Sequence, residues 1–193
     1  MEFVKLKSNK GEFLEGLIHI IPDVFNDERG YFLESWNSKK INEYLGKELI
    51  FIQDNISKSK KNVIRGLHYQ VNPSPQEKLI RCLSGSIFDV AVDIRKNSKT
   101  FGQWAGLEIS EKNKFQLLVP EGFAHGFLSL AEDSILYYKV TNLWDKKLEK
   151  TIKWNDKNID IQWPLSTNIP LISTKDKSGV SLIEAIKLKY IFF

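Results

Sequence analysis

The chain has 193 residues, of which 42% are hydrophobic and 27% are charged, so it can bury a substantial core and is not expected to be disordered. Basic residues exceed acidic ones by four. A lysine-rich surface is the simpler explanation of this excess, and a preference for anionic ligands such as phosphates is the functional one. Nucleic acid is disfavoured as a partner, because basic and acidic residues alternate without forming a basic stripe.

Cysteine content and hydropathy set the expected compartment. Cys82 is the only cysteine, so no disulfide can form within the chain. The N-terminal residues lack the apolar core of a secretion signal, and no apolar run reaches the length of a membrane span. We therefore expect one cytoplasmic domain over residues 1–193 that does not bind a membrane. Its C-terminal tail, from about residue 180, is expected to be specific to this chain.

Helical periodicity is confined to two segments. Asn37–Leu49 is predicted to hold one short helix, with Ile41, Tyr44 and Leu45 on one face. The tail Gly179–Phe193 is predicted to hold either a second helix or a last strand.

The remaining chain alternates strand-like runs with polar turns. Three pairs of strands are predicted: Leu79–Arg95 with a turn at "SGS", Gly102–Pro120 with a turn at "EKNK", and His125–Trp144 with a turn at "AEDS". Regularly spaced strands with polar turns are typical of an all-β sandwich or barrel.

The run Ile87–Arg95 has two different faces, because side chains alternate sides along a strand. One face is entirely apolar, and the other carries Asp89 and Asp93 between small apolar side chains. A solvated outer face is the simpler interpretation of these acids. The alternative is that they line the inside of a barrel and reach a cavity.

The sequence "VIRGLHYQ", Val63–Gln70, places Arg65 three residues before His68. A histidine in a strand is more often structural than catalytic, but Gly66 would let another group approach the backbone closely. In a regular strand, Arg65 and His68 would point to opposite faces. A bulge or twist is therefore required if both are to reach one cavity.

His125 lies after a predicted turn, in "VPEGFAHGF". Its neighbours Ala124 and Gly126 are small and leave room for a ligand. The alternative is a structural histidine that bonds a turn carbonyl.

Several catalytic classes lack their sequence motifs. There is no Gly-rich phosphate loop, no GxSxG nucleophile motif and no close pair of histidines of the kind that barrel metal sites use. The sequence therefore predicts acid–base chemistry without a metal or cofactor. His68 is the candidate base, since imidazole titrates near neutral pH. The candidate acids are Tyr137 and Tyr138, and the candidate cations are Arg29, Arg65, Lys78 and Arg81.

Five segments together resemble the dTDP-4-dehydrorhamnose 3,5-epimerase family. They are "DERGYFLESW" (27–36), "FIQDNISKSKKNVIRGLHYQ" (51–70), "QEKLIRCLSGSIFDVAVDIRKNSKTFGQW" (76–104), "VPEGFAHGFLSL" (119–130) and "KWNDKNIDIQWP" (153–164). The resemblance runs from about Ile18 to Asp176. It implies a cupin-type β-barrel (a jelly roll, or double-stranded β-helix) with a few short helices, which forms a homodimer and uses no metal.

The resemblance also implies a reaction. It is the inversion of C3 and C5 of dTDP-4-dehydro-6-deoxy-D-glucose, through an enolate, to dTDP-4-dehydro-L-rhamnose. The implied catalytic residues are the base His68, the acid Tyr138, Asp176 behind the imidazole, and Lys78 near the substrate carbonyl. A carboxylate behind an imidazole fixes its tautomer, and a fixed cation stabilises a developing enolate.

The remaining matches are implied contacts to the substrate. Arg65 matches a diphosphate contact, which suits the forked donors of arginine. Part of the nucleotide site is expected from the neighbouring subunit. The other implied substrate-binding residues are Arg29, Phe32, Glu34, Gln53, Asp54, Asn55, His125, Glu149 and Lys175.

Trp144 departs from the family pattern, which has a tyrosine that stacks on the base. An indole can still stack on thymine, but the identity of the base and the number of carbons inverted are left open. The alternatives are a C3-only epimerase, an epimerase of another nucleotide-linked 4-keto sugar, an isomerase that moves the keto group, and a non-catalytic sugar-nucleotide binding cupin. The combination of His68, Asp176 and Tyr138 disfavours the binding module, which needs no base.

Overall fold

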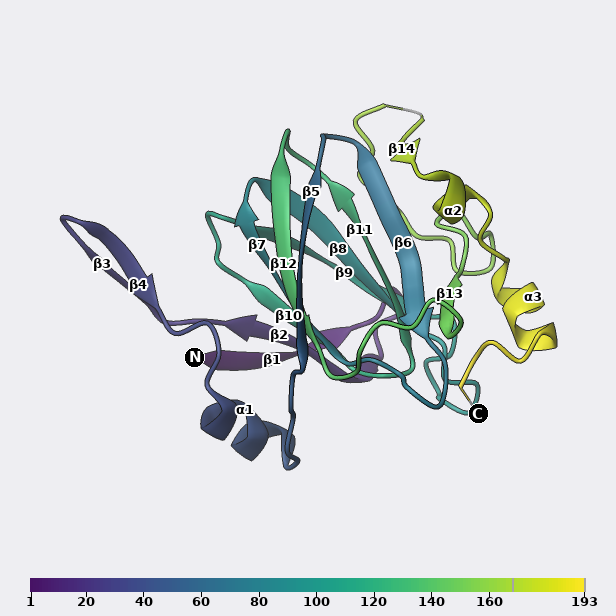
Figure 1. Cartoon of the computed structure of the whole chain (residues 1–193), viewed down its shortest axis with the longest axis horizontal. Helices are drawn as coiled ribbons and strands as arrows, with labels where there is room; N and C mark the ends of the chain where they lie inside the picture. The colour runs from purple at the N-terminus through teal and green to yellow at the C-terminus, as the bar shows by residue number, and fades with distance from the viewer. Residues whose placement is uncertain (168, 193) are drawn as a thin grey trace.

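Two β-sheets lie face to face and make up most of the molecule, and the computed structural model describes residues 1–167 and 169–192 (Figure 1). The neighbours in both sheets pair antiparallel. The first sheet has the order β1 (Glu2–Lys7), β2 (Phe13–Ile21), β10 (Gln116–Val119), β7 (Lys78–Ser84), β12 (Ser134–Val140) and β5 (Gln53–Ser59). The second has the order β13 (Glu149–Thr151), β6 (Val63–Gln70), β11 (Phe123–Ser129), β8 (Ser86–Asp93) and β9 (Trp104–Ser110), and β14 (Leu171–Ile172) pairs parallel to β6.

The chain crosses repeatedly from one sheet to the other. The three predicted turns are present, but each joins strands of different sheets: β7 to β8, β9 to β10, and β11 to β12. The two strands of each of these three pairs therefore lie in different sheets instead of forming a hydrogen-bonded hairpin. This connectivity places residues close in sequence on opposite walls of the space between the sheets.

The core has three layers. Between the sheets, Leu17, Ile80, Ile109 and Leu136 belong to one buried apolar cluster. Ile41 joins a second cluster on the outer face of the first sheet. A third cluster covers the outer face of the second sheet and includes the C-terminal tail.

The acidic face of β8 is not a solvated outer face, so the simpler interpretation of the sequence is wrong. The apolar face of β8 packs under the tail, and the other face points between the sheets. Asp89 and Asp93 are both fully buried, so this face is not solvated. Asp93 is structural, since it accepts hydrogen bonds from Arg95 and Thr100, whereas the Asp89 carboxylate bonds the His125 imidazole.

In the part of the chain that the structure describes, three short helices complete the fold. They are α1 (Ser38–Leu45), α2 (Thr174–Lys177) and α3 (Leu182–Lys187). The predicted helix after Asn37 is present, but it ends earlier than expected. Gly46 adopts a left-handed conformation there, with a φ of 66°, and its N–H bonds the Asn42 carbonyl.

The tail after residue 180 forms α3, which confirms the helical alternative. Leu182, Ala185 and Ile191 pack against the second sheet, and Phe192 pairs with Arg95. Residue 193, the end of the predicted tail segment, lies outside the described residues. Among the described residues, no helix is both long and apolar enough to traverse a lipid bilayer.

Candidate active site

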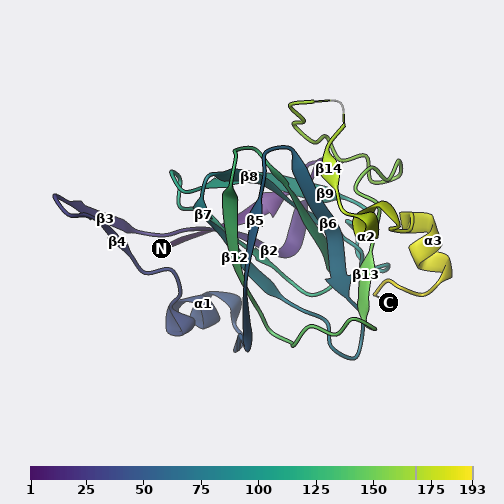
Figure 2. The same cartoon turned by 45° about the horizontal axis from the view of Figure 1, so that its top comes forward.

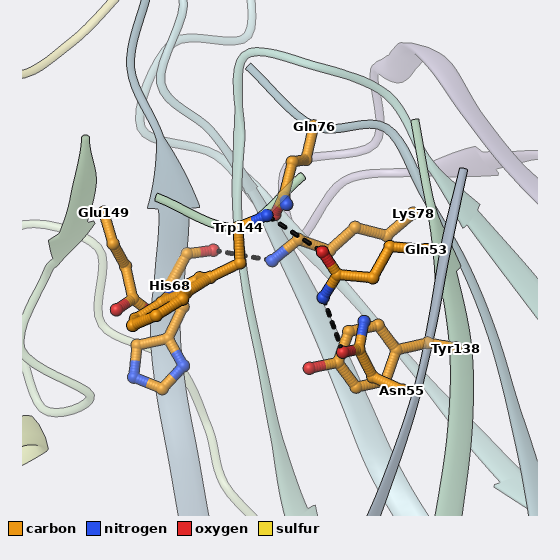
Figure 3. A pocket seen from close by; sticks show the side chains of 8 residues that line it. All are labelled: Gln53, Asn55, His68, Gln76, Lys78, Tyr138, Trp144 and Glu149. Atoms are coloured by element: carbon orange, nitrogen blue, oxygen red, sulfur yellow. Dashed lines mark hydrogen bonds between the residues drawn. The ribbon is translucent and has the colours of Figure 1, made fainter. Parts of the chain in front are cut away.

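A cavity of about 320 Å³ opens between the two sheets (Figure 3). It is lined by Gln53, Asn55, His68, Gln76, Lys78, Tyr138, Trp144 and Glu149. A second cavity, of about 220 Å³, shares four of these residues and adds Arg65, His125, Ser57, Phe127 and Leu136. The two cavities thus describe one continuous site, and most of the predicted site residues lie in its wall.

A bulge in β6 brings Arg65 and His68 to the same side. His68 lies opposite His125, and Arg65 lies opposite Phe127, so β6 has one more residue than β11 between these two pairs. Gly66 makes the bulge possible. Its φ is +125°, and a Cβ there would lie 2.6 Å from the Cα of Gly126. Of the two alternatives left by the sequence, a bulge or a twist, the structure shows a bulge.

His68 is held from behind by Asp176. Its Nε2 lies 2.6 Å from Asp176 Oδ1, and the other carboxylate oxygen accepts the Gly66 N–H at 3.3 Å. Burial by itself would raise the pKa of Asp176, but the bonds from His68 and Gly66 outweigh it and lower the pKa. With Nε2 engaged, Nδ1 is the His68 nitrogen that is free to take a proton.

His125 forms a second pair, with Asp89. Its Nε2 lies 2.8 and 3.0 Å from the two carboxylate oxygens, and both residues are buried. The expected alternative, a bond to a turn carbonyl, is not what holds this imidazole. The aspartate comes from the neighbouring strand β8.

Tyr138 and Lys78 reach the cavity from the first sheet. Burial raises the pKa of the Tyr138 phenol, and the nearby Glu149 carboxylate raises it further. Burial lowers the pKa of Lys78 to about 8, against the opposing charges of Glu149 and Asp89. Tyr138 therefore stays protonated at neutral pH, and Lys78 is a buried cation that is close to losing its proton.

Glu149 and Lys175 form an ion pair of 2.6 Å at the edge of the site. Burial alone would raise the pKa of Glu149, but Lys175 and the indole of Trp144 lower it. Figure 3 shows that indole directed towards Glu149. The backbone N–H of Trp144 donates to Gln53 Oε1 at 2.9 Å, and Gln53 Nε2 donates to Asn55 Oδ1 at 2.8 Å.

Arg65 and Asp54 lie at the margins of the site. Arg65 donates to Ser59 Oγ and to the Lys58 carbonyl, which leaves guanidinium donors for a ligand. The Asp54 carboxylate bonds Tyr137 and Lys139 instead of lining the cavity.

The predicted nucleotide residues Arg29, Phe32 and Glu34 are not brought to this cavity. Arg29 lies at the turn between β3 (Val24–Asp27) and β4 (Gly30–Leu33), Phe32 is on β4, and Glu34 follows it. Figures 1 and 2 show this hairpin projecting away from the two sheets. Phe32 is 69% exposed, although it is a large apolar side chain.

Strand alternation separates the two candidate acids. Tyr138 faces the cavity, whereas the Tyr137 hydroxyl bonds Asp54 at 2.7 Å outside it. Arg81 lines a small hollow with Tyr137 and Trp36, so this candidate cation is outside the site as well.

Two polar lining residues, Ser57 and Gln76, were missed from the sequence, and so was Asp89, which lies behind His125 and does not line the cavity. Asp89 was left as an alternative because the buried position of β8 was unknown. Ser57 lies two residues after Asn55 and four after Gln53, so all three side chains share one face of β5. This alternation was the signal available in the sequence. Within residues 1–167 and 169–192, the buried Ser57 Oγ has no hydrogen-bond partner. Gln76 precedes the strand β7, and no pattern marked it.

Comparison with known proteins assigns the site to a family. Residues 12–184 match the model of the dTDP-4-dehydrorhamnose 3,5-epimerase family. The chain is 52% identical, over 164 residues, to the dTDP-4-dehydrorhamnose 3,5-epimerase of Shigella flexneri, covering 85% of this chain and 90% of that protein. It is 33% identical over 172 residues to a dTDP-4-dehydrorhamnose 3-epimerase of Streptomyces niveus, covering 89% of this chain and 82% of that protein.

The fold agrees with a solved relative. The dTDP-6-deoxy-D-glucose-3,5-epimerase of Legionella pneumophila, in complex with dTDP-4-keto-L-rhamnose, is 39% identical and superposes with a TM-score of 0.89. That match covers 99% of this chain and 98% of the relative. The two-sheet architecture is thus the predicted cupin-type barrel. Since both the sequence match and the structural match span most of its length, the chain belongs to the dTDP-4-dehydrorhamnose 3,5-epimerase family.

Proposed function

We propose that the chain inverts C3 and C5 of dTDP-4-dehydro-6-deoxy-D-glucose to give dTDP-4-dehydro-L-rhamnose, as an isomerase that uses no cofactor. One observation carries the proposal. His68 and Tyr138 enter one cavity from opposite sheets, with an acidic partner behind the imidazole and a buried lysine between them in the lining. A base and an acid on opposite sides of a carbon are what inversion requires.

The proton transfers balance without any change of oxidation state. Nδ1 of His68 takes the proton from a carbon next to the C4 carbonyl. The electrons of that C–H bond form a carbon–carbon double bond, and the negative charge moves to the C4 oxygen. Lys78 stabilises this enolate. The enolate then reforms the carbonyl as the Tyr138 hydroxyl delivers a proton to the opposite face.

The electrostatics suit these roles. Asp176 is held ionised and stabilises the imidazolium that forms when His68 takes the proton. The raised pKa of Tyr138 keeps its proton available, and Lys78, with a pKa of about 8, is mostly charged at neutral pH. His125, held by Asp89, contacts the sugar.

The nucleotide occupies the outer part of the site in this proposal. Arg65 binds the diphosphate, and Trp144 stacks on the base. The other contacts are Gln53, Asn55, Glu149 and Lys175 from this cavity, with Asp54 nearby.

The active form is proposed to be a homodimer. The projecting hairpin with its exposed Phe25 and Phe32 would complete the partner's site, which gives Arg29, Phe32 and Glu34 a nucleotide to bind. The extent of the domain, the absence of a metal and the cytoplasmic location stay predictions from the sequence.

Proton NMR of dTDP-4-dehydro-6-deoxy-D-glucose in D₂O tests the proposal. Deuterium at both C3 and C5, with formation of the L-sugar, is the expected result. Exchange at C3 alone would make the protein a C3-epimerase, an outcome that the Streptomyces niveus relative and Trp144 keep open. No exchange at either carbon would contradict epimerisation. His68→Ala is the matched control: it should bind dTDP normally and exchange neither proton.

A further inference from the structure

Gln70, the last residue of β6, is a buried amide with three hydrogen bonds. Only 1% of it is exposed. Its Nε2 donates to the Ser74 carbonyl at 2.7 Å and to the Leu143 carbonyl at 3.1 Å. Its Oε1 accepts the Asp145 N–H at 2.6 Å. The amide nitrogen thus donates two hydrogen bonds, and the amide oxygen accepts one, all with backbone groups.

Two of these bonds bracket Trp144, because Leu143 precedes it and Asp145 follows it. The backbone N–H of Trp144 is itself held by Gln53 Oε1. The backbone around the indole is therefore fixed by two glutamine side chains, one buried and one in the cavity wall. The indole remains 53% exposed and open to a ligand.

The same bonds extend to the next pocket residue. The Asp145 carbonyl accepts the N–H groups of Leu148 and Glu149 at 3.1 and 3.0 Å. Glu149 in turn lies opposite Gln70 in the pairing of β13 with β6. The segment 143–149 is therefore attached to β6 at both ends, and it carries two residues of the cavity wall.

We propose that Gln70 is a positioning residue for nucleotide recognition: it holds the backbone around Trp144 so that the indole is in place to stack on the nucleotide base. The inference rests on the proposed function of Trp144. A segment that is ordered before binding loses less conformational entropy when the ligand arrives, so the benefit appears as affinity. The strand β6 then carries three functional side chains within six residues. They are the diphosphate contact Arg65, the proton acceptor His68, and Gln70, which supports the Trp144 indole.

Binding of dTDP and of inorganic pyrophosphate, each measured by calorimetry, tests this role. Trp144→Ala should raise the Kd for dTDP by about 10-fold, the usual loss of one base–aromatic stack. Gln70→Met, whose side chain has similar length but no amide, should raise the Kd for dTDP by about 5-fold. The loss should not exceed that of Trp144→Ala, because Gln70 acts only by supporting the stack of Trp144 on the base. Pyrophosphate, which has no base, should bind both variants as it binds the wild type. With the sugar nucleotide, Gln70→Met should raise KM more than it lowers kcat.

A double-mutant cycle separates positioning from general stability. In the Trp144→Ala background, adding Gln70→Met should change the dTDP affinity by less than about 2-fold. Equal losses in both backgrounds, or an equal loss of pyrophosphate binding, would overturn the inference. Gln103→Met is the matched control, because Gln103 is also a buried amide, bonded to Ser8 away from the cavity.

Two further outcomes distinguish this inference from the proposed function. Normal dTDP binding by Gln70→Met, with weak binding by Trp144→Ala, overturns the positioning role alone. Normal binding by Trp144→Ala overturns the stacking role of the indole, and the inference with it. If Gln70→Met fails to fold, Gln70→Asn, which keeps the amide on a side chain one methylene shorter, should give an intermediate loss of dTDP affinity, and wild-type affinity would contradict the role.

Discussion

The site contains two histidine–aspartate pairs that differ in access and in origin. His68 is 25% exposed and its Nε2 lies 2.6 Å from Asp176, whereas the His125 side chain is 10% exposed and lies 2.8 Å from Asp89. Asp176 comes from a helix 108 residues away, and Asp89 comes from the adjacent strand, 36 residues away. The same two groups thus form one pair with a partly exposed imidazole and one pair that is buried throughout.

The difference shows that a histidine–aspartate pair does not determine its own role. Both imidazoles line the smaller cavity, but only His68 also lines the larger one, together with Trp144. Both histidines lie on neighbouring strands of one sheet, and His68 is the more accessible of the two. We therefore assign proton transfer to His68 and positioning of the sugar to His125.

Removing the two imidazoles should have the largest and most unequal effects. His68→Ala should lower kcat by about 10³-fold or more, because general base catalysis is lost at both carbons. His125→Ala should lower kcat/KM by about 10-fold, the scale of one lost hydrogen bond to substrate. Steady-state kinetics with coupled reduction of the product measures both. Equal losses would abolish the distinction between the two pairs.

Removing the Asp176 carboxylate should lower kcat less than removing the His68 imidazole. Asp176→Asn should lower kcat by about 10²-fold, because the imidazolium loses its counter-charge and its preferred tautomer. Hydrogen–deuterium exchange at C3 and C5, followed by NMR, measures the proton transfer directly. An Asp176→Asn enzyme that exchanges as fast as the wild type would assign the aspartate to folding only.

The Asp89 carboxylate of the His125–Asp89 pair should act on Lys78 through its negative charge. The Asp89 carboxylate raises the pKa of Lys78 against the effect of burial, which lowers it to about 8. Asp89→Asn should therefore lower that pKa further, and kcat/KM should begin to fall at a lower pH than in the wild type, where it falls above about pH 8. A pH profile from 6 to about 9.5 shows the shift. An unchanged alkaline limb would mean that Lys78 is not the group that titrates.

The contribution of the His68–Asp176 pair to stability should be small and should disappear at acidic pH. The pKa of Asp176 is lowered in the folded protein, so its ionised form contributes stability above the unfolded-state value of about 4. That contribution disappears as the pH falls through the folded-state pKa. The difference in unfolding free energy between the wild type and Asp176→Asn, about 1 kcal/mol at neutral pH, should shrink below about pH 4. Urea unfolding at several pH values measures it, and a constant difference would contradict the linkage.

Much of the site could be predicted from the sequence, because the motifs named residue types for a known chemistry. His68, Tyr138, Lys78 and Asp176 were all expected, and the structure brings all four to one region. Asp89 could not be assigned in the same way. Its role depended on whether one face of β8 met solvent or the other sheet, and alternation along a strand is the same in both cases.

By itself, the sequence determined the strand and turn pattern, the need for a bulge or twist if Arg65 and His68 share one cavity, and the set of acid–base groups. These follow from local properties: side-chain alternation, glycine conformation and titration near neutral pH. Only the tertiary structure decided that the strands joined by the three predicted turns lie in opposite sheets, that Asp89 reaches His125, and that Gln70 holds the backbone on either side of Trp144. Those contacts join residues far apart in the chain, and their formation depends on packing energy that no local pattern of residues records.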